Sequence, residues 1–362
     1  MQNIEAIIDQ FDLPAGARTA APYGNGHINS TYSITTPGGR FILQMVNSYV
    51  FPKPEQVMEN IELVTEYLRE KILAEGGDPA RETLSLIKTH DGKTFVIDAE
   101  GRYWRMYPFI ERTISYDLPD TPELFALSGE AFGHFQRQLQ DFPAQKLHEV
   151  IPHFHDTPAR YQQLLDAIEQ DAVGRAKDVQ AEITFCREHR EETSTLLDAL
   201  NRKEIPLRVT HNDTKLNNVL LDAETGRGIC VIDLDTVMPG LAAYDFGDSI
   251  RTGANMAAED EQDLTRVQLS LPMFEAFTRG YLKEMRTSLT PKEIELLPMG
   301  AKLMTLENGL RFLADHLNGD KYFHIHHEGH NLDRARAQFA LVQRMEEHWD
   351  DMMTIVQNCA KE

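Results

Sequence analysis

The chain has 362 residues, 41% of them apolar and 26% charged, with a formal net charge of -21 at neutral pH. These proportions are typical of globular proteins, and the length predicts two domains. The negative charge repels nucleic-acid phosphates and anionic lipids, so we expect neither a nucleic-acid nor a membrane partner. The three cysteines are widely spaced, which indicates a reducing compartment. Because the start lacks a signal-peptide pattern and no apolar stretch could span a membrane, we expect a cytoplasmic protein.

The first third of the sequence predicts a small antiparallel sheet and one long helix. Turn formers at residues 22–29 and 37–40 separate short apolar runs, as in hairpins, whereas residues 55–75 carry apolar side chains at helical spacing. The predicted elements are a helix over 3–12, strands over 31–35 and 40–46, a helix over about 55–75, and strands over 84–89, 93–99 and 104–111.

Beyond Pro119 the pattern becomes mainly helical, which together with the sheet predicts the α+β class. We expect two lobes, over residues 1–112 and 113–362. The predicted elements are helices over 122–142, 158–172 and 178–200, a short strand over 206–211, a hairpin over 219–222 and 228–233, and helices from about 257 to the end, interrupted near Pro291 and over 318–333.

The densest polar cluster is residues 210–218, Thr-His-Asn-Asp-Thr-Lys-Leu-Asn-Asn, and the hairpin that follows it leads into Asp233 and Asp235. Phosphoryl transfer needs a carboxylate near the acceptor hydroxyl, oxygen ligands for Mg²⁺ and a cation for the phosphate charge. This cluster contains all three kinds of group, and it therefore predicts a phosphoryl-transfer site.

The pattern His-x-Asp-x-Lys-x-x-Asn, followed by a hairpin and Asp, resembles the catalytic loop of protein kinases and of the aminoglycoside phosphotransferase family. Residues 210–218 and 232–240 are most similar to bacterial N-acetylhexosamine 1-kinases within that family. Further similar stretches run from PYGNGHINSTY near the start to GLRFLADHLNGDKYF near the end. The resemblance implies a bilobal protein-kinase-like fold with the site in a cleft, ATP as co-substrate, Mg²⁺ as cofactor, and the C1 hydroxyl of N-acetylglucosamine or N-acetylgalactosamine as acceptor.

The resemblance implies a role for each polar residue of the motif. Asp213 would orient the sugar hydroxyl or take its proton, and Lys215 would contact the γ-phosphate. Asn218 and Asp233 would bind Mg²⁺, and Asp235 would either share the metal or support the loop. The structural alternatives are a helix cap, a turn asparagine and an exposed lysine.

The tripeptide Asp245-Phe246-Gly247 has the same letters as the metal-binding tripeptide of protein kinases. Asp245 lies 32 residues after Asp213, whereas Asp233 lies 20 after it and directly follows the hairpin. We therefore assign the metal role to Asp233. In the resembling family, an aspartate at the position of Asp245 braces the catalytic loop or lies near the acceptor.

The nucleotide is expected to contact the first lobe. Backbone N–H groups at Gly24 and Gly26 could cover its phosphates, although such a loop is also an ordinary hairpin turn. Met106, Tyr107 and Phe109 lie in the strand that would form the hinge beside adenine, and they could equally be plain core residues.

Gln44 is the main departure from many kinases, because a lysine or arginine that grips the α- and β-phosphates is expected at this strand position. Glutamine can donate hydrogen bonds but brings no charge. Nucleotide binding must then rely on Mg²⁺ and loop amides, and a lysine–glutamate pair with the following helix is in doubt.

The resemblance places His27, Asp245, Arg311 and Tyr322 near the sugar, where the last two could hold acetamido and hydroxyl groups. On residue type alone, a turn histidine or a helix arginine is usually solvated or ion-paired. The four histidines between 324 and 330 lack a zinc-like ligand set and predict a solvated polar loop.

Two other functions remain open. A kinase of the same fold could act on another sugar, an aminoglycoside, choline or homoserine, and the acidic composition would suit a cationic acceptor. A catalytically silent nucleotide-binding protein is supported only by Gln44. Oligomeric state cannot be read from the sequence.

Overall fold

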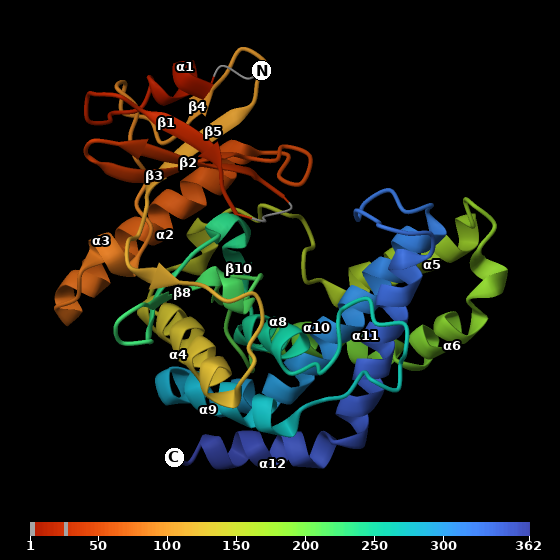
Figure 1. The fold of residues 1–362 in the computed structure, drawn as a ribbon. Helices are drawn as coiled ribbons and strands as arrows, with labels where there is room; N and C mark the ends of the chain where they lie inside the picture. The colour runs from red at the N-terminus through yellow and green to blue at the C-terminus, as the bar shows by residue number, and fades with distance from the viewer. Residues whose placement is uncertain (1–3, 25–27) are drawn as a thin grey trace. The chain divides into compact units, whose positions relative to one another are not determined.

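The computed structural model describes residues 4–24 and 28–362, and the chain divides into two compact units (Figure 1). The first unit contains Met1–Ser115, apart from the undescribed positions, together with Asp141–Pro152 and Val219–Pro239. The second contains Tyr116–Gln140, His153–Asn218 and Gly240–Glu362. The predicted lobes over 1–112 and 113–362 divide the chain by function and remain a prediction.

A five-stranded antiparallel sheet of order β1-β2-β3-β5-β4 forms the centre of the first unit. One face buries Ile34, Leu43, Trp104 and Met106 against Phe11 near the N-terminal helix. On the other face, the register places Gln44 directly opposite residues of both neighbouring strands. The elements are α1 (Ile4–Ile8), β1 (Thr19–Pro22), β2 (Ser30–Thr36), β3 (Gly39–Met45), β4 (Val96–Ile97) and β5 (Tyr103–Pro108).

The long helix of the first unit, α2 (Pro54–Glu75), confirms the prediction for residues 55–75. It starts with proline at its first position and ends at Gly76 in the left-handed conformation, a common way to terminate a helix. Its buried Asn60 donates hydrogen bonds to the carbonyls of His148 (2.8 Å) and Val237 (2.9 Å). These bonds attach two later parts of the sequence to the first unit.

A three-stranded antiparallel sheet of order β6-β8-β9 also lies in the first unit and contains the predicted hairpin. The remaining elements of this unit are α3 (Pro79–Glu82), β6 (Thr113–Ile114), β8 (Val219–Asp222), β9 (Gly228–Val231), and 3₁₀ helices over Ala144–Lys146 and Leu234–Thr236.

The prediction of a strand over residues 84–89 is wrong. The strand predicted over 93–99 is present only as the shorter β4. Thr89 forms a single bridge with Phe11, and the N–H of Ile87 donates to Met106 O. Residues 98–102 instead form a turn in which the Asp98 carboxylate accepts the Arg102 N–H (2.9 Å). An apolar run needs a continuous partner to become a strand, and this one meets its neighbours at single points.

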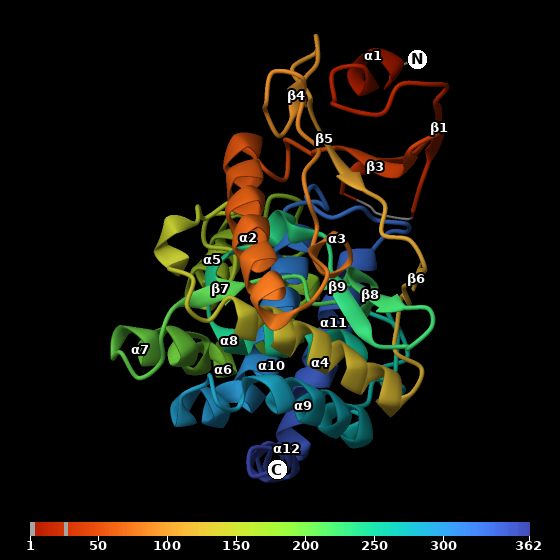
Figure 2. The ribbon, with the colours of Figure 1, turned by 90° about the vertical axis from the view of Figure 1, so that its left-hand side faces the viewer.

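The second unit is helical, as predicted, and its core surrounds α10. Figure 1 shows α4 beside α9, and Figure 2 shows α12 below α9; these helices are in contact. The helices are α4 (Pro122–Gln138), α5 (Thr157–Gln170), α6 (Gln180–Glu188), α7 (Thr195–Asn201), α8 (Ala242–Gly253), α9 (Leu271–Met285), α10 (Pro291–Leu317), α11 (His330–Glu347) and α12 (Trp349–Cys359).

The helix expected over 178–200 is divided into α6 and α7 by a 3₁₀ helix, Arg190–Ser194, whereas the predicted interruptions at Pro291 and within 318–333 are confirmed. Thr290 caps α10 through a capping box with Glu293, so the proline starts this helix rather than breaking it. The other short elements are 3₁₀ helices over Ala176–Asp178 and Leu216–Asn218 and strands β7 (Arg208–Thr210) and β10 (Met238–Gly240).

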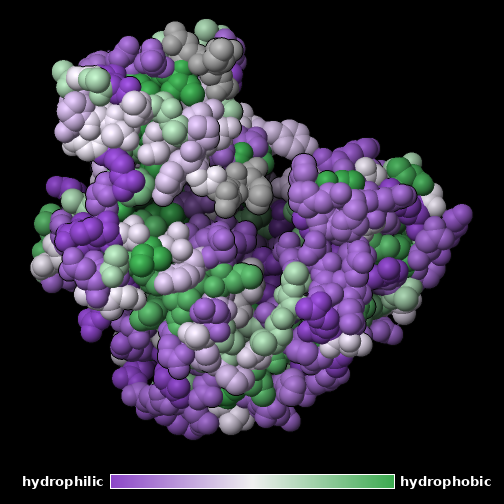
Figure 3. All heavy atoms as spheres, viewed as in Figure 1, coloured by the Kyte–Doolittle hydropathy of each residue, from purple (hydrophilic) through white to green (hydrophobic). Residues whose placement is uncertain are grey.

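No helix among the described residues is long and apolar enough to span a bilayer. Figure 3 shows mainly hydrophilic residues over the visible faces of α5 and α11 in the second unit. This face of the helical unit is therefore mainly polar.

Helices α8 and α10 pack at a distance that only glycine permits. A Cβ atom on Gly247 would lie 2.3 Å from Gly300 O, and one on Gly300 would lie 2.3 Å from Ala243 O. Because backbone atoms cannot move aside like flexible side chains, the two glycines fix how closely these helices approach.

We expect Gly300→Ala to lower the free energy of unfolding by about 1–3 kcal/mol, since the added methyl group forces α8 and α10 apart. Chemical denaturation followed by circular dichroism measures this change. Glu295→Ala on an exposed part of α10 is the control, with an expected change within about 0.5 kcal/mol. Equal stability of the two variants would contradict the packing argument.

Candidate active site

The predicted catalytic loop, residues 211–218, follows β7 and is held by a buried carboxylate of α8. Asp245 Oδ2 accepts hydrogen bonds from the His211 N–H (2.9 Å) and from Gln136 Nε2 (2.6 Å), and Oδ1 accepts from the Asn212 N–H (2.7 Å). Asn212 has a φ of 65°, a left-handed conformation that asparagine tolerates better than most residues. Asp245 thus braces the loop, and its predicted contact with substrate remains a prediction.

A second aspartate on the same helix supports the next part of the loop. The Thr214 N–H donates to Asp248 Oδ2 (2.9 Å), and Ser249 Oγ donates to Thr214 O (2.8 Å). The other oxygen of Asp248 pairs with Arg251 at 2.9 Å. Sequence reasoning missed Asp248, although its position three residues after Asp245 places both carboxylates on one side of a helix.

Asp213 projects from this braced loop with 27% of its side chain exposed. Its Oδ1 lies 2.9 Å from Lys215 Nζ, and its Oδ2 accepts from Asn218 Nδ2 at 3.2 Å. Burial disfavours the charged form, but the nearby positive groups, Lys215 foremost, together outweigh burial, so the pKa of Asp213 lies below the ordinary value. The Asp213 carboxylate raises the pKa of Lys215 to about 12. The loop therefore presents an ionised carboxylate next to an ammonium group.

The predicted metal ligands are divided between the units. Asn218, in the second unit, donates its Nδ2 to Asp213 O (2.8 Å) as well as to the carboxylate, and no hydrogen bond to its Oδ1 occurs in the described chain. Asp233, in the first unit, follows β9 with a φ of 60°. An amide oxygen and a carboxylate are the donors that Mg²⁺ prefers, so their chemistry fits this ion. Their metal role remains a prediction.

Asp235 already has partners for both carboxylate oxygens. Oδ2 accepts from Asn29 Nδ2 (2.7 Å), and Oδ1 lies 2.5 Å from Arg105 NH2. These contacts agree with the loop-supporting alternative for Asp235; its metal role stays a prediction.

The residues predicted to contact adenine lie at the end of β5. The carbonyl of Met106 accepts from the Ile87 N–H, and the Phe109 N–H donates to Arg40 O, both at 2.9 Å. Met106 and Tyr107 are buried. These backbone groups are engaged within the sheet, and the nucleotide contacts of Met106, Tyr107 and Phe109 remain predictions.

Only part of the predicted glycine loop can be examined. Gly24 has a φ of +76°, a conformation that favours glycine, and a Cβ atom there would meet open space. Gly26 and His27 lie outside the described residues. The phosphate role of both glycines and the acceptor role of His27 therefore stay predictions.

Arg311 on α10 lies between two aromatic rings of the second unit. Its guanidinium carbon is 5.4 Å from the ring centroids of both Phe154 and Phe323. Within the described chain, no acceptor forms a hydrogen bond or ion pair with this guanidinium. The stacked, partly exposed group is thus held in place while its N–H donors remain available.

The loop that carries Tyr322 is fixed by Asp315. The Asp315 carboxylate accepts from the N–H groups of Lys321 (3.0 Å), Tyr322 (2.9 Å) and Phe323 (2.9 Å). The Tyr322 side chain is 49% exposed. Asp315 therefore orders the segment that supplies both an aromatic partner of Arg311 and an exposed phenol.

A buried dyad, which the sequence did not reveal, joins Glu307, on the same helix as Arg311, to His155 just before α5. His155 Nδ1 lies 2.8 Å from Glu307 Oε1, and Thr157 Oγ1 donates to Glu307 Oε2 at 2.8 Å. The His155 ring also packs 5.1 Å from the ring of Tyr244, which precedes Asp245 on α8. These contacts connect the surroundings of Arg311 with the helix that braces the catalytic loop.

The histidines near residue 330 differ from the expected solvated loop in one respect. His330 is buried and its Nε2 lies 2.9 Å from Asp260 Oδ2, whereas His324, His326 and His327 are exposed.

A separate group with metal-ligand chemistry consists of His189, Glu192 and Glu346. The Lys302 ammonium lies 2.6 Å from Glu192 Oε2 and 2.8 Å from Glu346 Oε1. The charge of these two carboxylates is therefore partly offset by Lys302, and a cation would have to compete with it.

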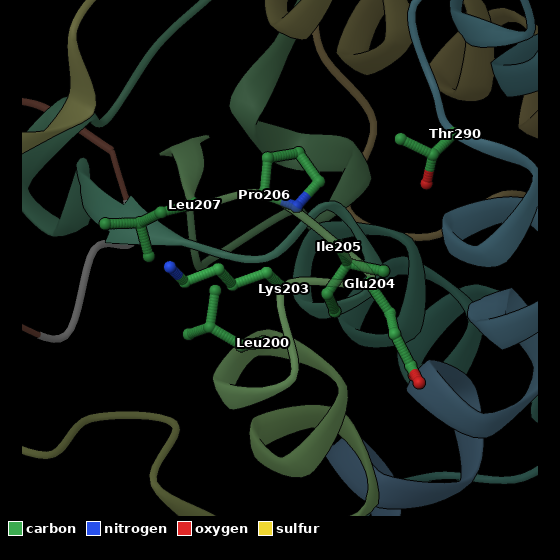
Figure 4. A pocket seen from close by; sticks show the side chains of 7 residues that line it. All are labelled: Leu200, Lys203, Glu204, Ile205, Pro206, Leu207 and Thr290. Atoms are coloured by element: carbon green, nitrogen blue, oxygen red, sulfur yellow. The ribbon is translucent and has the colours of Figure 1, made fainter.

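The second unit also has a hollow of about 430 Å³ between the end of α7 and the start of α10. Figure 4 shows the side chains of Lys203 and Glu204 extending in opposite directions there. None of the predicted site residues lines this hollow. Its lining residues are Leu200, Lys203, Glu204, Ile205, Pro206, Leu207 and Thr290.

Comparisons with known proteins show the family of this chain. The family model named APH, the phosphotransferase enzyme family, matches residues 19–283. The chain therefore belongs to this family.

Solved structures share the fold at low sequence identity. An aminoglycoside phosphotransferase from Alicyclobacillus acidocaldarius subsp. acidocaldarius DSM 446 matches with a TM-score of 0.61 and 12% identity, covering 98% of this chain and 96% of its own. A choline kinase from Cryptosporidium parvum Iowa II matches with a TM-score of 0.55 and 13% identity, covering 95% and 94%. A microcompartment-associated aminopropanol kinase matches with a TM-score of 0.54 and 16% identity, covering 95% and 96%.

We expect Lys215→Met to move the acidic limb of the pH–activity profile to higher pH. The pKa of Asp213 is held down mainly by Lys215 while burial raises it, so removing the ammonium lets this pKa rise. The measurement is kcat/KM as a function of pH for both proteins. A reduced rate with an unmoved acidic limb would show that Lys215 does not control the ionisation of Asp213.

Proposed function

We propose that this protein is an ATP-dependent kinase that phosphorylates the anomeric C1 hydroxyl of N-acetylglucosamine or N-acetylgalactosamine. The observation that carries the proposal is the braced catalytic loop, in which an ionised Asp213 lies 2.9 Å from Lys215 and is bonded by Asn218. A carboxylate with a low pKa, held by a rigid loop and accompanied by a cation, suits the transfer of a phosphoryl group to a hydroxyl.

In this mechanism Asp213 orients the acceptor hydroxyl and accepts its proton. The hydroxyl oxygen forms a bond to the γ-phosphorus as the bond to the β–γ bridging oxygen breaks, and ADP leaves with the electron pair. Lys215 offsets negative charge on the transferred group. Mg²⁺, when bound by Asn218 and Asp233, would neutralise phosphate charge.

The surroundings of Arg311 support a neutral, oxygen-rich acceptor. Arg160 lies close enough that burial and, after it, the charge of Arg311 lower the pKa of Arg160, while the nearby Glu307 and Asp156 carboxylates partly offset this effect. A cationic acceptor, such as choline or an aminoglycoside, would bring a further positive charge towards these two guanidinium groups. Acetamido and hydroxyl oxygens could instead accept from the donors of Arg311, while the exposed Tyr322 could contact the sugar. The same kinase fold with a cationic acceptor is therefore the weaker proposal.

An ADP-release assay with ATP and Mg²⁺ tests this function against N-acetylglucosamine, N-acetylgalactosamine, glucose, galactose, choline, homoserine and kanamycin. We expect turnover with the N-acetylhexosamines, a product phosphorylated at C1, and a loss of about 1,000-fold or more in kcat for Asp213→Asn with ATP binding retained. Turnover only on another acceptor would replace the sugar assignment, and silence throughout with ATP bound would favour a catalytically silent protein.

We expect Arg311→Met to raise KM for the N-acetylhexosamine about tenfold or more, because charge-assisted hydrogen bonds to the sugar are lost while the apolar stem is kept. Steady-state kinetics should show an unchanged KM for ATP. Arg187→Met, which alters an exposed arginine on α6, is the matched control. Equal KM values for the sugar in the two variants would remove Arg311 from the acceptor site.

A further inference from the structure

Gln44, which stands where a cation is expected, has protein partners at both polar atoms of its side chain. Its Oε1 accepts from both Nε (3.1 Å) and NH2 (2.9 Å) of Arg105, and its Nε2 donates to Thr31 Oγ1 (3.2 Å). The sheet register places these three residues opposite one another on neighbouring strands, so their side chains form a row on one face. Gln44 therefore fixes the orientation of the Arg105 guanidinium.

Arg105 brings a positive charge to that row. Its side chain is only 1% exposed, and NH2 lies 2.5 Å from Asp235 Oδ1. Asp235 is itself fixed by Asn29 (2.7 Å) and lies two residues after Asp233. The guanidinium is thus anchored from two sides, by the sheet and by the segment that follows β9.

The third nitrogen of this guanidinium is not used by the protein. NH1 of Arg105 is buried and has no hydrogen-bond acceptor within the described chain. A buried donor without an acceptor lowers the stability of the folded protein. An anionic ligand with several oxygen atoms would satisfy this donor and would also interact with the charge, as arginine commonly does with phosphate.

The acidic residues of α2 do not take the place of Asp235. Glu59 pairs with His148 (2.7 Å), Glu62 pairs with Lys88, and Glu55 accepts from the Tyr103 hydroxyl. The charge of Arg105 is therefore neutralised by Asp235, in the segment after β9, and not by a glutamate of α2.

We propose that Arg105 is the cation that binds the nucleotide phosphates in this protein, with Gln44 and Asp235 as positioning residues that hold its guanidinium. This inference rests on the proposed use of ATP. It assigns to β5 the charge that a lysine or arginine on β3 would otherwise supply.

The test compares the binding of ADP and adenosine to the full-length chain by calorimetry, in EDTA so that no metal contributes. Asp235→Asn is the reference, because removing Arg105 alone would leave a buried carboxylate without its partner. Relative to this reference, Arg105→Gln/Asp235→Asn should weaken ADP about tenfold or more and adenosine by less than about threefold. Arg102→Gln, which removes a positive charge from the turn before β5, should change neither ligand.

Asp235→Asn alone gives a second result that does not require the double variant to fold. Because the asparagine oxygen can still accept from Arg105 NH2 but no longer offsets its charge, and Gln44 still holds the guanidinium, ADP should bind more tightly than it does to the wild type, with adenosine unchanged. Equal weakening of ADP and adenosine, or unchanged ADP binding in the double variant, would show that Arg105 only supports the structure. If the wild type bound neither ligand even after Mg²⁺ replaced the EDTA, the nucleotide use itself would be refuted.

Discussion

The candidate site depends on one set of hydrogen bonds. In it, buried carboxylates of α8 accept from backbone N–H groups of the predicted catalytic loop. Asp245 and Asp248 together bond the N–H groups of His211, Asn212 and Thr214. A buried carboxylate is costly unless it is hydrogen-bonded, and a buried N–H group is costly without an acceptor. Each hydrogen bond therefore lowers the free-energy cost of burying both the carboxylate and the N–H group. The loop that carries Asp213 is thereby held in one conformation.

Helix α8 can serve as this brace only because α10 holds it in place. Glycines at 247 and 300 allow the two helices to approach until backbone meets backbone. Along α10, Glu307, Arg311 and Asp315 follow at intervals of four residues, so they lie on one side of the helix. One helix pair thus positions both the catalytic loop and the residues proposed to meet the acceptor. A disturbance of this pair would affect both, even without contact with either ligand.

The sequence predicted the features that depend on residues close together in the chain. The spacing of Asp213, Lys215 and Asn218 and the hairpin before Asp233 identified the motif, and α2 and the start of α10 followed from periodicity and proline. The bracing that the family resemblance implied for Asp245 is present. Pairings such as Gln44 with Arg105 and His155 with Glu307 join residues 61 and 152 positions apart. No local signal specifies them, because they arise from strand register and helix packing.

Pairings that are set by the fold also explain how a chain with a net charge of -21 can bind anionic ligands. Lys215, Arg105 and Arg251 are each paired with an aspartate, so these positions are close to neutral within the protein. A phosphate group therefore gains little from the overall charge of the chain. It would gain from N–H donors that the aspartates leave unsatisfied, and such donors are set by the geometry of each pair. Total charge therefore predicts weak binding to polyanionic surfaces, which remains a prediction, and it is compatible with a small phosphate-bearing ligand, since affinity for such a ligand depends on a few oriented donors.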